Sequence, residues 1–327
     1  MNYHKLQDYL NSIDLRGLKS DHIKIVELKA YEKQGFSNKI FLIKVKTSTG
    51  FHKELILRVY PSNGKKALRE FKILSILYDM GIPVPEVYAI DKNGEVLGKP
   101  FIIMERIRQS STANIYEFID AAAESLVSVH NVTPIEIEGI IEIKNNYPLN
   151  ELRGIKALLT LSMLTSLRNH IFFAELFRCA ENLGKNHFKA RLRLIHGDYG
   201  FDNIIYSGGK AYIVDWESAG IAEPTFDVAY AFNFLDFDDR ISGRTGQKLS
   251  EAFINSYEKY GGSIMYFEFY RKLAAIKILA ILEAVSQPGL MGFLSKEFRR
   301  RTENEDIKRF LEMFKRYLRE ILSLKNY

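Results

Sequence analysis

The chain of 327 residues contains one cysteine, Cys179, and no long uninterrupted apolar run. A single thiol excludes an internal disulfide and any metal site built from several cysteines, and it favours a reducing compartment. The most apolar stretch, residues 273–285, is interrupted by Lys277 and Glu283, and the N-terminal residues have no apolar signal core. These absences predict a cytoplasmic protein that has no membrane partner.

A strong excess of one charge is also absent. The formal net charge is +6, with 46 Lys and Arg against 40 Asp and Glu, and the basic residues are spread along the chain. This balance permits anionic ligands but does not single out nucleic acid, so we expect no nucleic-acid partner. Hydrophobic residues make up 46% of the chain, which is enough to fill the cores of two structural units.

The pattern of apolar residues changes after about residue 106. Before this point, residues 1–20 and 67–80 have helical spacing, and strand-like runs occupy residues 25–28, 40–45, 53–59 and 100–104. After it, the chain is mostly helical and ends in an amphipathic stretch at residues 305–324. We therefore expect an α+β fold. A small antiparallel sheet at residues 1–106 would bind nucleotide, and a larger, mainly helical unit at residues 107–327 would bind the acceptor.

Three polar residues with a characteristic spacing point to chemistry. Asp198 is followed by Asn203 five residues later and by Asp215 twelve residues beyond that. Phosphoryl transfer to a hydroxyl needs a carboxylate near the nucleophile and two oxygen ligands for the Mg²⁺ that bridges the phosphates. The spacing therefore indicates a phosphotransferase.

A predicted hairpin explains how these residues could meet. Apolar runs at residues 203–206 and 211–214 flank a Gly-Gly pair, whose freedom to adopt positive φ angles suits a two-residue turn. Pairing outward from the turn brings Asn203 and Asp215 together at the open end, beside the loop that carries Asp198. This arrangement would form a metal site next to a catalytic carboxylate.

The His-Gly-Asp-x-x-x-x-Asn block, followed by Ile-Val-Asp-Trp-Glu, resembles the aminoglycoside phosphotransferase and choline kinase group of small-molecule kinases. The fold of that group is similar to the two-lobed protein-kinase fold. The resemblance implies that Asp198 acts as the catalytic base and that Asn203 and Asp215 hold Mg²⁺. It further implies that His196 and Asp227 support the catalytic loop.

Residues before position 71 offer candidates for nucleotide binding. Gly35, Ser37 and Asn38 lie in a turn between two predicted strands, where backbone amides and a hydroxyl could fold over the β- and γ-phosphates. Related kinases often carry such a stretch. Arg58 stands near the end of a strand, where kinases place a phosphate-binding lysine, and its planar guanidinium suits phosphate oxygens. Glu70, on the next predicted helix, is its expected ion-pair partner.

Two further assignments concern the same ligand. Lys44, on the earlier strand, is a rival to Arg58 for the phosphate contact. Met104, Glu105 and Ile107 close the predicted sheet where kinases have their hinge. There the backbone of Glu105 and Ile107 would pair with adenine, and Met104 would border the pocket.

The expected function is an ATP-dependent transfer, with GTP as a possible substitute, to the hydroxyl of a small molecule by a monomer or homodimer. The acceptor stays open between an aminoglycoside, choline, homoserine and sugar-like compounds. Asp236, Asp238 and Asp239 form an acidic and aromatic stretch that would suit an ammonium group, or else a charged loop. Glu217 and Glu223 could face the metal or a cationic acceptor.

Two alternatives belong to other classes, an atypical protein kinase and a catalytically silent nucleotide-binding regulator. No activation segment of useful length separates Asp215 from Pro224, which counts against the first. The second has no need of Asp198, Asn203 and Asp215 together.

Overall fold

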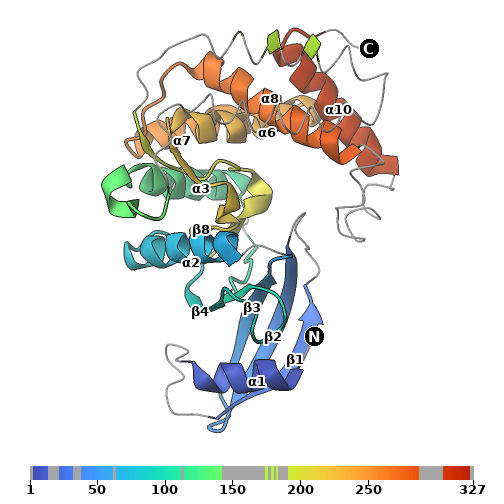
Figure 1. Ribbon diagram of the computed structural model, residues 1–327. Helices are drawn as coiled ribbons and strands as arrows, with labels where there is room; N and C mark the ends of the chain where they lie inside the picture. Colours follow the sequence, from blue (N-terminus) through green and yellow to red (C-terminus); the bar gives the residue numbers. More distant parts are fainter. Residues whose placement is uncertain are drawn as a thin grey trace.

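A computed structural model shows an antiparallel sheet at one end of the molecule and a group of helices at the other (Figure 1). This arrangement confirms the expected α+β fold class. The residues that the structure describes are 3–13, 22–31, 38–61, 64–111, 114–141, 174–175, 178–179, 182, 191–286 and 305–324.

Five antiparallel strands form the sheet, in the order β1-β2-β3-β5-β4. Their bounds are β1 Ile23–Ala30, β2 Lys39–Thr47, β3 His52–Val59, β4 Val87–Asp91 and β5 Phe101–Glu105. The four predicted strands fall on β1, β2, β3 and β5. The stretch that we expected only to be extended pairs with β5 as the short edge strand β4.

Each face of the sheet packs against one helix because strand side chains alternate between faces. Leu55 and Leu57 on β3 are completely buried in the core that also includes the apolar side of α1 (Tyr3–Ser12). Residues between them face α2 (Gly64–Asp79), so the alternation places Arg58 on the α2 side. The helix predicted over residues 1–20 is shorter than expected, since α1 ends at Ser12.

The helical part begins after β5, and the domain boundary predicted near residue 106 lies between β5 and α3. That division stays a prediction. Helices α6, α8 and α10 share one core, and α3 and α7 pack beside a second. In the described part of the chain, no helix combines the length and the apolar character needed to cross a bilayer. The helices are α3 Ile115–His130, α6 Thr225–Ile241, α7 Leu249–Lys259, α8 Phe267–Ser286 and α10 Glu305–Ile321, with a 3-10 turn, η1, at Pro134–Ile137.

Two small strand pairs carry the segments singled out in the sequence. β6 (Arg193–Ile195) pairs with β9 (Gly220–Ala222), and β7 (Ile204–Ser207) pairs with β8 (Lys210–Ile213). In the second pair Ile204 lies opposite Ile213, and both turn glycines have positive φ angles of 57° and 80°. The predicted hairpin and its register are confirmed.

Candidate active site

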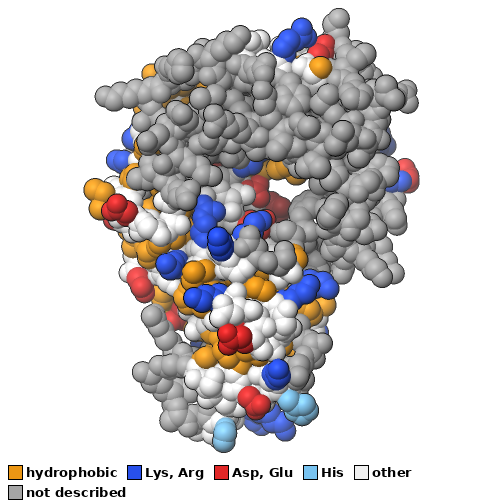
Figure 2. Space-filling view, viewed as in Figure 1, with side chains coloured by type: hydrophobic (Ala, Val, Ile, Leu, Met, Phe, Trp, Pro, Cys, Tyr) orange, Lys and Arg blue, Asp and Glu red, His pale blue; other side chains and the backbone are white. Residues whose placement is uncertain are grey.

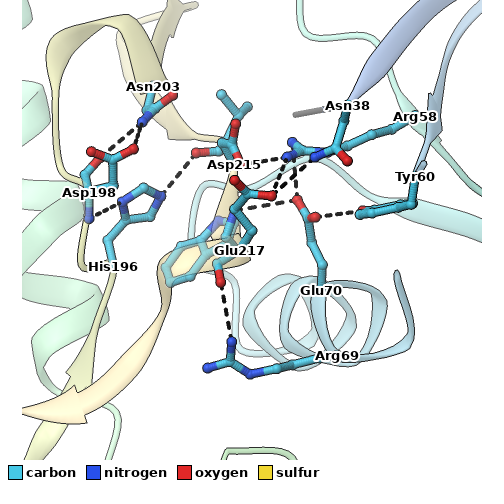
Figure 3. A network of polar contacts seen from close by, with 12 residues as sticks. Asn38, Arg58, Tyr60, Arg69, Glu70, His196, Asp198, Asn203, Asp215 and Glu217 are labelled. Atoms are coloured by element: carbon cyan, nitrogen blue, oxygen red, sulfur yellow. Dashed lines mark hydrogen bonds and ion pairs between the residues drawn. The ribbon is translucent and has the colours of Figure 1, made fainter. Parts of the chain in front are cut away.

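The loop between β6 and the 3-10 turn η3 (Phe201–Asn203) carries Asp198. The side-chain amide Nδ2 of Asn203 donates to the backbone oxygen of Asp198 at 2.9 Å and to its carboxylate Oδ2 at 3.2 Å (Figure 3). Because the amide nitrogen faces Asp198, the amide oxygen of Asn203 points elsewhere and can serve another ligand. The structure thus brings these two predicted residues together.

Residues of α3, α6 and α8 hold the loop that carries Asp198. Asp227, on the first turn of α6, accepts hydrogen bonds from the backbone amides of His196 at 2.6 Å and Gly197 at 2.8 Å. His130 of α3 also contacts this carboxylate, at 3.2 Å. From α8, Lys277 Nζ donates to the Gly197 carbonyl at 2.9 Å. The geometry agrees with the supporting role predicted for Asp227.

His196 is fully buried and uses both ring nitrogens within the chain. Its Nδ1 lies 3.3 Å from the amide nitrogen of Asp198, which donates to it, and its Nε2 lies 3.0 Å from the carbonyl of Val214. The ring also meets the Trp216 indole edge to face, with 4.9 Å between centroids. His196 therefore joins the Asp198 loop to the end of β8, which agrees with a structural role and not with that of a base.

Two backbone positions show how closely this loop approaches the segment after β8. Gly197 has a φ of +80°, and a Cβ there would lie 2.4 Å from the carbonyl oxygen of Ser218, so only glycine fits. Asp215 is a non-glycine residue in the left-handed region, with φ 67° and ψ 65°, directly before the 3-10 turn η4 (Trp216–Ser218). Such conformations cluster at functional sites.

On the sheet side, Arg58 reaches from β3 to Asp215. Its NH2 group lies 2.5 Å from Asp215 Oδ1, and its NH1 group lies 3.3 Å from Glu70 Oε1 (Figure 3). The predicted Arg58–Glu70 pair is therefore present, and it is buried. Glu70 is held further by the Tyr60 hydroxyl at 2.5 Å and by the Trp216 amide at 3.3 Å.

Charge and burial act in opposite directions in this network. Burial would lower the pKa of Arg58, but the negative charges of Glu70 and Asp215 outweigh it and raise the pKa well above its usual value. Burial raises the pKa of Glu70, and the positive charge of Arg58 offsets only part of that effect. The guanidinium thus stays charged where an anionic ligand would meet it.

Asn38, the last residue of the predicted phosphate-binding turn, lies next to the segment after Asp215. Its Nδ2 donates to Glu217 Oε2 at 3.2 Å. Arg69 of α2 donates to the backbone oxygens of Glu217, at 3.2 Å, and of Ala219. Gly35 and Ser37, the other residues predicted for this turn, lie outside the described residues.

Side chains that carry oxygen lie near Asp198, among them those of Asp202 and Asn203. Partial desolvation and repulsion from Asp198 and Asp215 raise the pKa of Asp202, although its side chain keeps exposed surface. The described part of the chain contains no cluster of three or more His, Cys, Asp or Glu that could hold a metal. Asn203 and Asp215 therefore stay the predicted metal ligands, which would act through an amide oxygen and a carboxylate oxygen. Mg²⁺ is typically held by one or two protein oxygens together with phosphate oxygens and water.

One face of the molecule has a hollow near its middle (Figure 2). In the space-filling view, acidic side chains are visible inside it and basic side chains lie beside it (Figure 2). The hollow lies between the sheet-bearing end and the helices α6 and α8 of Figure 1. An acidic floor with basic neighbours suits a nucleotide that carries a cation.

The segment predicted to be the hinge includes the last two residues of β5 and continues just beyond that strand. Met104 is buried on β5, and the Glu105 amide donates to the Glu86 carbonyl at 2.7 Å. Glu105 and Ile107 border an open cavity of about 300 Å³ that also touches Tyr212. This cavity does not include Asp198 or Asp215. The buried charges of Arg58 and Glu70 lie instead beside Asp215.

Other charged candidates are bound within the chain. Lys44 lies on the inner strand β2 and pairs with Glu27 at 2.7 Å and with Glu54 at 3.9 Å, whereas Arg58 pairs with Asp215. The acidic residues considered for an ammonium-bearing acceptor are also bonded to neighbours: Asp236 to Arg271 and Tyr317, Asp238 to Arg244, Asp239 to the amides of Leu249 and Ser250, and Glu223 to the amide of Arg191. Residues 236–239 lie within α6, so the alternative of a charged loop is wrong, and these contacts favour a structural role of the acidic side chains in that helix.

Comparison with known proteins now gives a family. The model of the phosphotransferase enzyme family, APH, matches residues 32–262, which include Arg58, Asp198, Asn203 and Asp215. The chain belongs to this phosphotransferase family.

Similar proteins are found both among curated sequences and among solved structures. Acyl-CoA dehydrogenase family member 11 of Rattus norvegicus is 25% identical over 335 residues, and the match covers 89% of this chain but 40% of that protein. The phosphotransferase chain thus spans less than half the length of this curated relative.

Among solved structures, a putative aminoglycoside phosphotransferase from Ralstonia eutropha superposes with a TM-score of 0.67 at 18% identity, covering 97% of this chain and 98% of that one. The ADP-bound aminoglycoside phosphotransferase APH(2'')-Ib gives 0.56 at 14%, covering 97% and 99%. At these identities the likeness shows the fold, which is protein-kinase-like.

Sequence reasoning missed three residues that contact this site. Arg69, Lys277 and Tyr230 each bond to the catalytic segment or to the segment after Asp215. Lys277 left one signal, since a lysine inside an apolar helix usually needs a partner. Tyr230 left another, because it lies three residues after Asp227 and so on the same helix face.

Proposed function

We propose that this phosphotransferase moves the γ-phosphate of ATP to a hydroxyl group of a small molecule. The observation that carries the proposal is that polar side chains from the two parts of the molecule converge. Asp198 and Asn203 come from the helical part. Arg58 of β3, paired with Glu70 of α2, reaches Asp215 from the sheet-bearing part. The ADP in the similarly folded phosphotransferase supports a nucleotide ligand.

Each residue then has a defined task. Arg58 would hold phosphate oxygens, and Glu70 would keep the guanidinium in place. Asn203 and Asp215 would hold Mg²⁺, which when bound offsets negative charge on the phosphates. Asn203 would at the same time keep Asp198 oriented through its amide nitrogen.

Asp198 would accept the proton of the acceptor hydroxyl while the hydroxyl oxygen forms a bond to the γ-phosphorus. The bond between the γ-phosphorus and the bridging oxygen breaks, and ADP leaves with the electron pair. The phosphoryl group ends on the acceptor, and the proton passes from Asp198 to solvent. No other reactant is needed.

The segment after Asp215 supports a small acceptor over a protein. Every residue from Asp215 to the start of α6 is described: η4 comes first, and β9 then pairs with β6. This stretch is too short to include the long activation loop with which a protein kinase binds its substrate. The bonded state of Asp236, Asp238 and Asp239 gives no support to an ammonium-bearing acceptor.

The experiment is a screen for acceptor-dependent ADP release with Mg·ATP and, separately, Mg·GTP. The panel should hold choline, homoserine, aminoglycosides and sugars. It should also hold hydroxyacyl-CoA esters, because the rat relative is named for acyl-CoA chemistry. We expect one compound class to give a phosphomonoester detectable by ³¹P NMR.

Two results would overturn the proposal. Tight nucleotide binding without any phosphorylated small molecule would favour a silent regulator. Phosphate transfer confined to protein substrates would favour a protein kinase. Asp198→Asn is the matched negative control in either case.

A further inference from the structure

Tyr230 on α6 contacts the carboxylate of Asp198 directly. Its hydroxyl donates to Asp198 Oδ1 at 2.5 Å. Tyr230 lies three residues after Asp227, so the two side chains leave the same face of the helix. One helix therefore holds the loop at two successive points, with Asp227 binding the backbone amides of His196 and Gly197 and Tyr230 binding the side chain of Asp198.

The tyrosine ring has little freedom to move. It is 4% exposed, and its centroid lies 6.2 Å from that of Phe226 and 5.6 Å from that of Phe234. A Cβ on Gly200 would lie 3.9 Å from the ring edge, so the catalytic loop covers the ring from the other side. Burial, followed by repulsion from Asp198, raises the pKa of Tyr230 well above its usual value, which keeps its proton in place for donation.

Both oxygens of the Asp198 carboxylate thus have a donor. Tyr230 binds Oδ1 and Asn203 binds Oδ2. The last torsion of an aspartate side chain is broad, so a single donor would leave the carboxylate free to turn. Two donors from separate elements, α6 and η3, fix its plane.

We infer that Tyr230 is a positioning residue, which sets the orientation in which Asp198 meets the acceptor hydroxyl. The inference rests on the proposed function, in which Asp198 is the base. Proton transfer requires alignment with the attacking oxygen, and small misplacements of a reacting group lower rates strongly. Removing the Tyr230 hydroxyl should therefore slow turnover by about 10- to 100-fold.

The kinetic test compares Tyr230→Phe with Tyr317→Phe. Both residues are buried tyrosines whose hydroxyl donates to a carboxylate, but the Tyr317 hydroxyl donates to Asp236 at 2.8 Å and not to Asp198. We expect Tyr230→Phe to lower kcat while the KM for nucleotide and the unfolding midpoint stay near wild type. Tyr317→Phe should keep kcat close to wild type. In an Asp198→Asn background, Tyr230→Phe should cause no further loss.

A second measurement does not depend on turnover. Crystal structures of wild type and Tyr230→Phe, grown under the same conditions, should show the Asp198 carboxylate rotated or split between orientations in the variant. An unchanged carboxylate would overturn the inference, as would an unchanged kcat or an equal further loss in the Asp198→Asn background. If no acceptor supports turnover, the proposed function fails while the two structures still decide the role of Tyr230.

Discussion

In the sheet-bearing part of the molecule, the buried carboxylate of Glu70 faces a guanidinium, whereas in the helical part the buried carboxylate of Asp227 faces two peptide amides. Both residues are at most 1% exposed. The first arrangement fixes a charged side chain, Arg58, that would meet the ligand. The second fixes the stretch of backbone that leads to Asp198, whose side chain is held separately by Tyr230 and Asn203.

The two arrangements differ in what is lost when one of their residues is replaced. Removing one member of a buried ion pair leaves an uncompensated charge in a dry environment, while replacing both with apolar groups is often neutral. Removing an amide acceptor leaves unsatisfied backbone donors and frees the loop that they belong to. Breaking the Arg58–Glu70 pair should therefore mainly lower the free energy of unfolding. Removing the Asp227 carboxylate should mainly change the geometry of the loop.

The largest effect should come from the residue that both arrangements serve. Asp198→Asn removes the proton acceptor but keeps the shape of the side chain. We expect kcat to fall by about 10²- to 10⁴-fold, while ADP binding measured by titration calorimetry stays near wild type. Full turnover in this variant would show that another group takes the proton.

Arg58→Met tests the ion-pair side. The variant leaves Glu70 buried without its cation, and we expect a loss of about 3–5 kcal/mol in the free energy of unfolding, measured with denaturant. The matched double variant Arg58→Met with Glu70→Leu should recover most of that stability. Nucleotide affinity should stay weak in both variants, since the phosphate ligand is missing from each.

Recovery of nucleotide binding in the double variant would contradict the role of Arg58. A single variant as stable as wild type would contradict the comparison itself, because it would mean that Glu70 does not depend on the guanidinium.

Asp227→Asn tests the amide side. An asparagine offers one acceptor oxygen where two amides and His130 now point, so one backbone donor loses its partner. Hydrogen bonds to a charged acceptor contribute about 1.5–3 kcal/mol, and we expect a destabilisation of that size in thermal or denaturant unfolding. Turnover should fall more than nucleotide affinity, since the loop moves while Arg58 stays. An equal loss of both would place Asp227 on the nucleotide side.

The parts of this site that could be predicted from the sequence are those with local signals. The Gly-Gly turn set the hairpin register, and the order of strand and following helix, together with opposite charges, paired Arg58 with Glu70. Tyr230 and Lys277 were missed because their contacts depend on how α6 and α8 pack beneath the loop. The local signals at Tyr230 and Lys277 suggest that each side chain has a role, but they do not identify the loop as its partner.

The charges of residues 236–239 were ambiguous for the same physical reason. A carboxylate that accepts amides at the start of another helix and one that binds a cationic ligand can have similar neighbours in the sequence. Only the positions of α7 and α8 show that Asp239 accepts amides at the start of α7 and that Asp236 meets Arg271.

Asp239 extends the comparison to a carboxylate outside the site and gives the smallest expected effect. Burial would raise its pKa, but hydrogen bonds from the Ser250 and Leu249 amides outweigh that effect and lower it below the usual value. A lowered pKa in the folded state means that the stabilisation is present above the usual aspartate pKa and is lost as the pH falls through the lowered value. Asp239→Asn should therefore cost about 1 kcal/mol near pH 7. The gap between variant and wild type in thermal unfolding should close below about pH 4. A gap that stays constant or widens in acid would show that the charge of Asp239 contributes nothing, and that the amides at the start of α7 require only the shape of an acceptor.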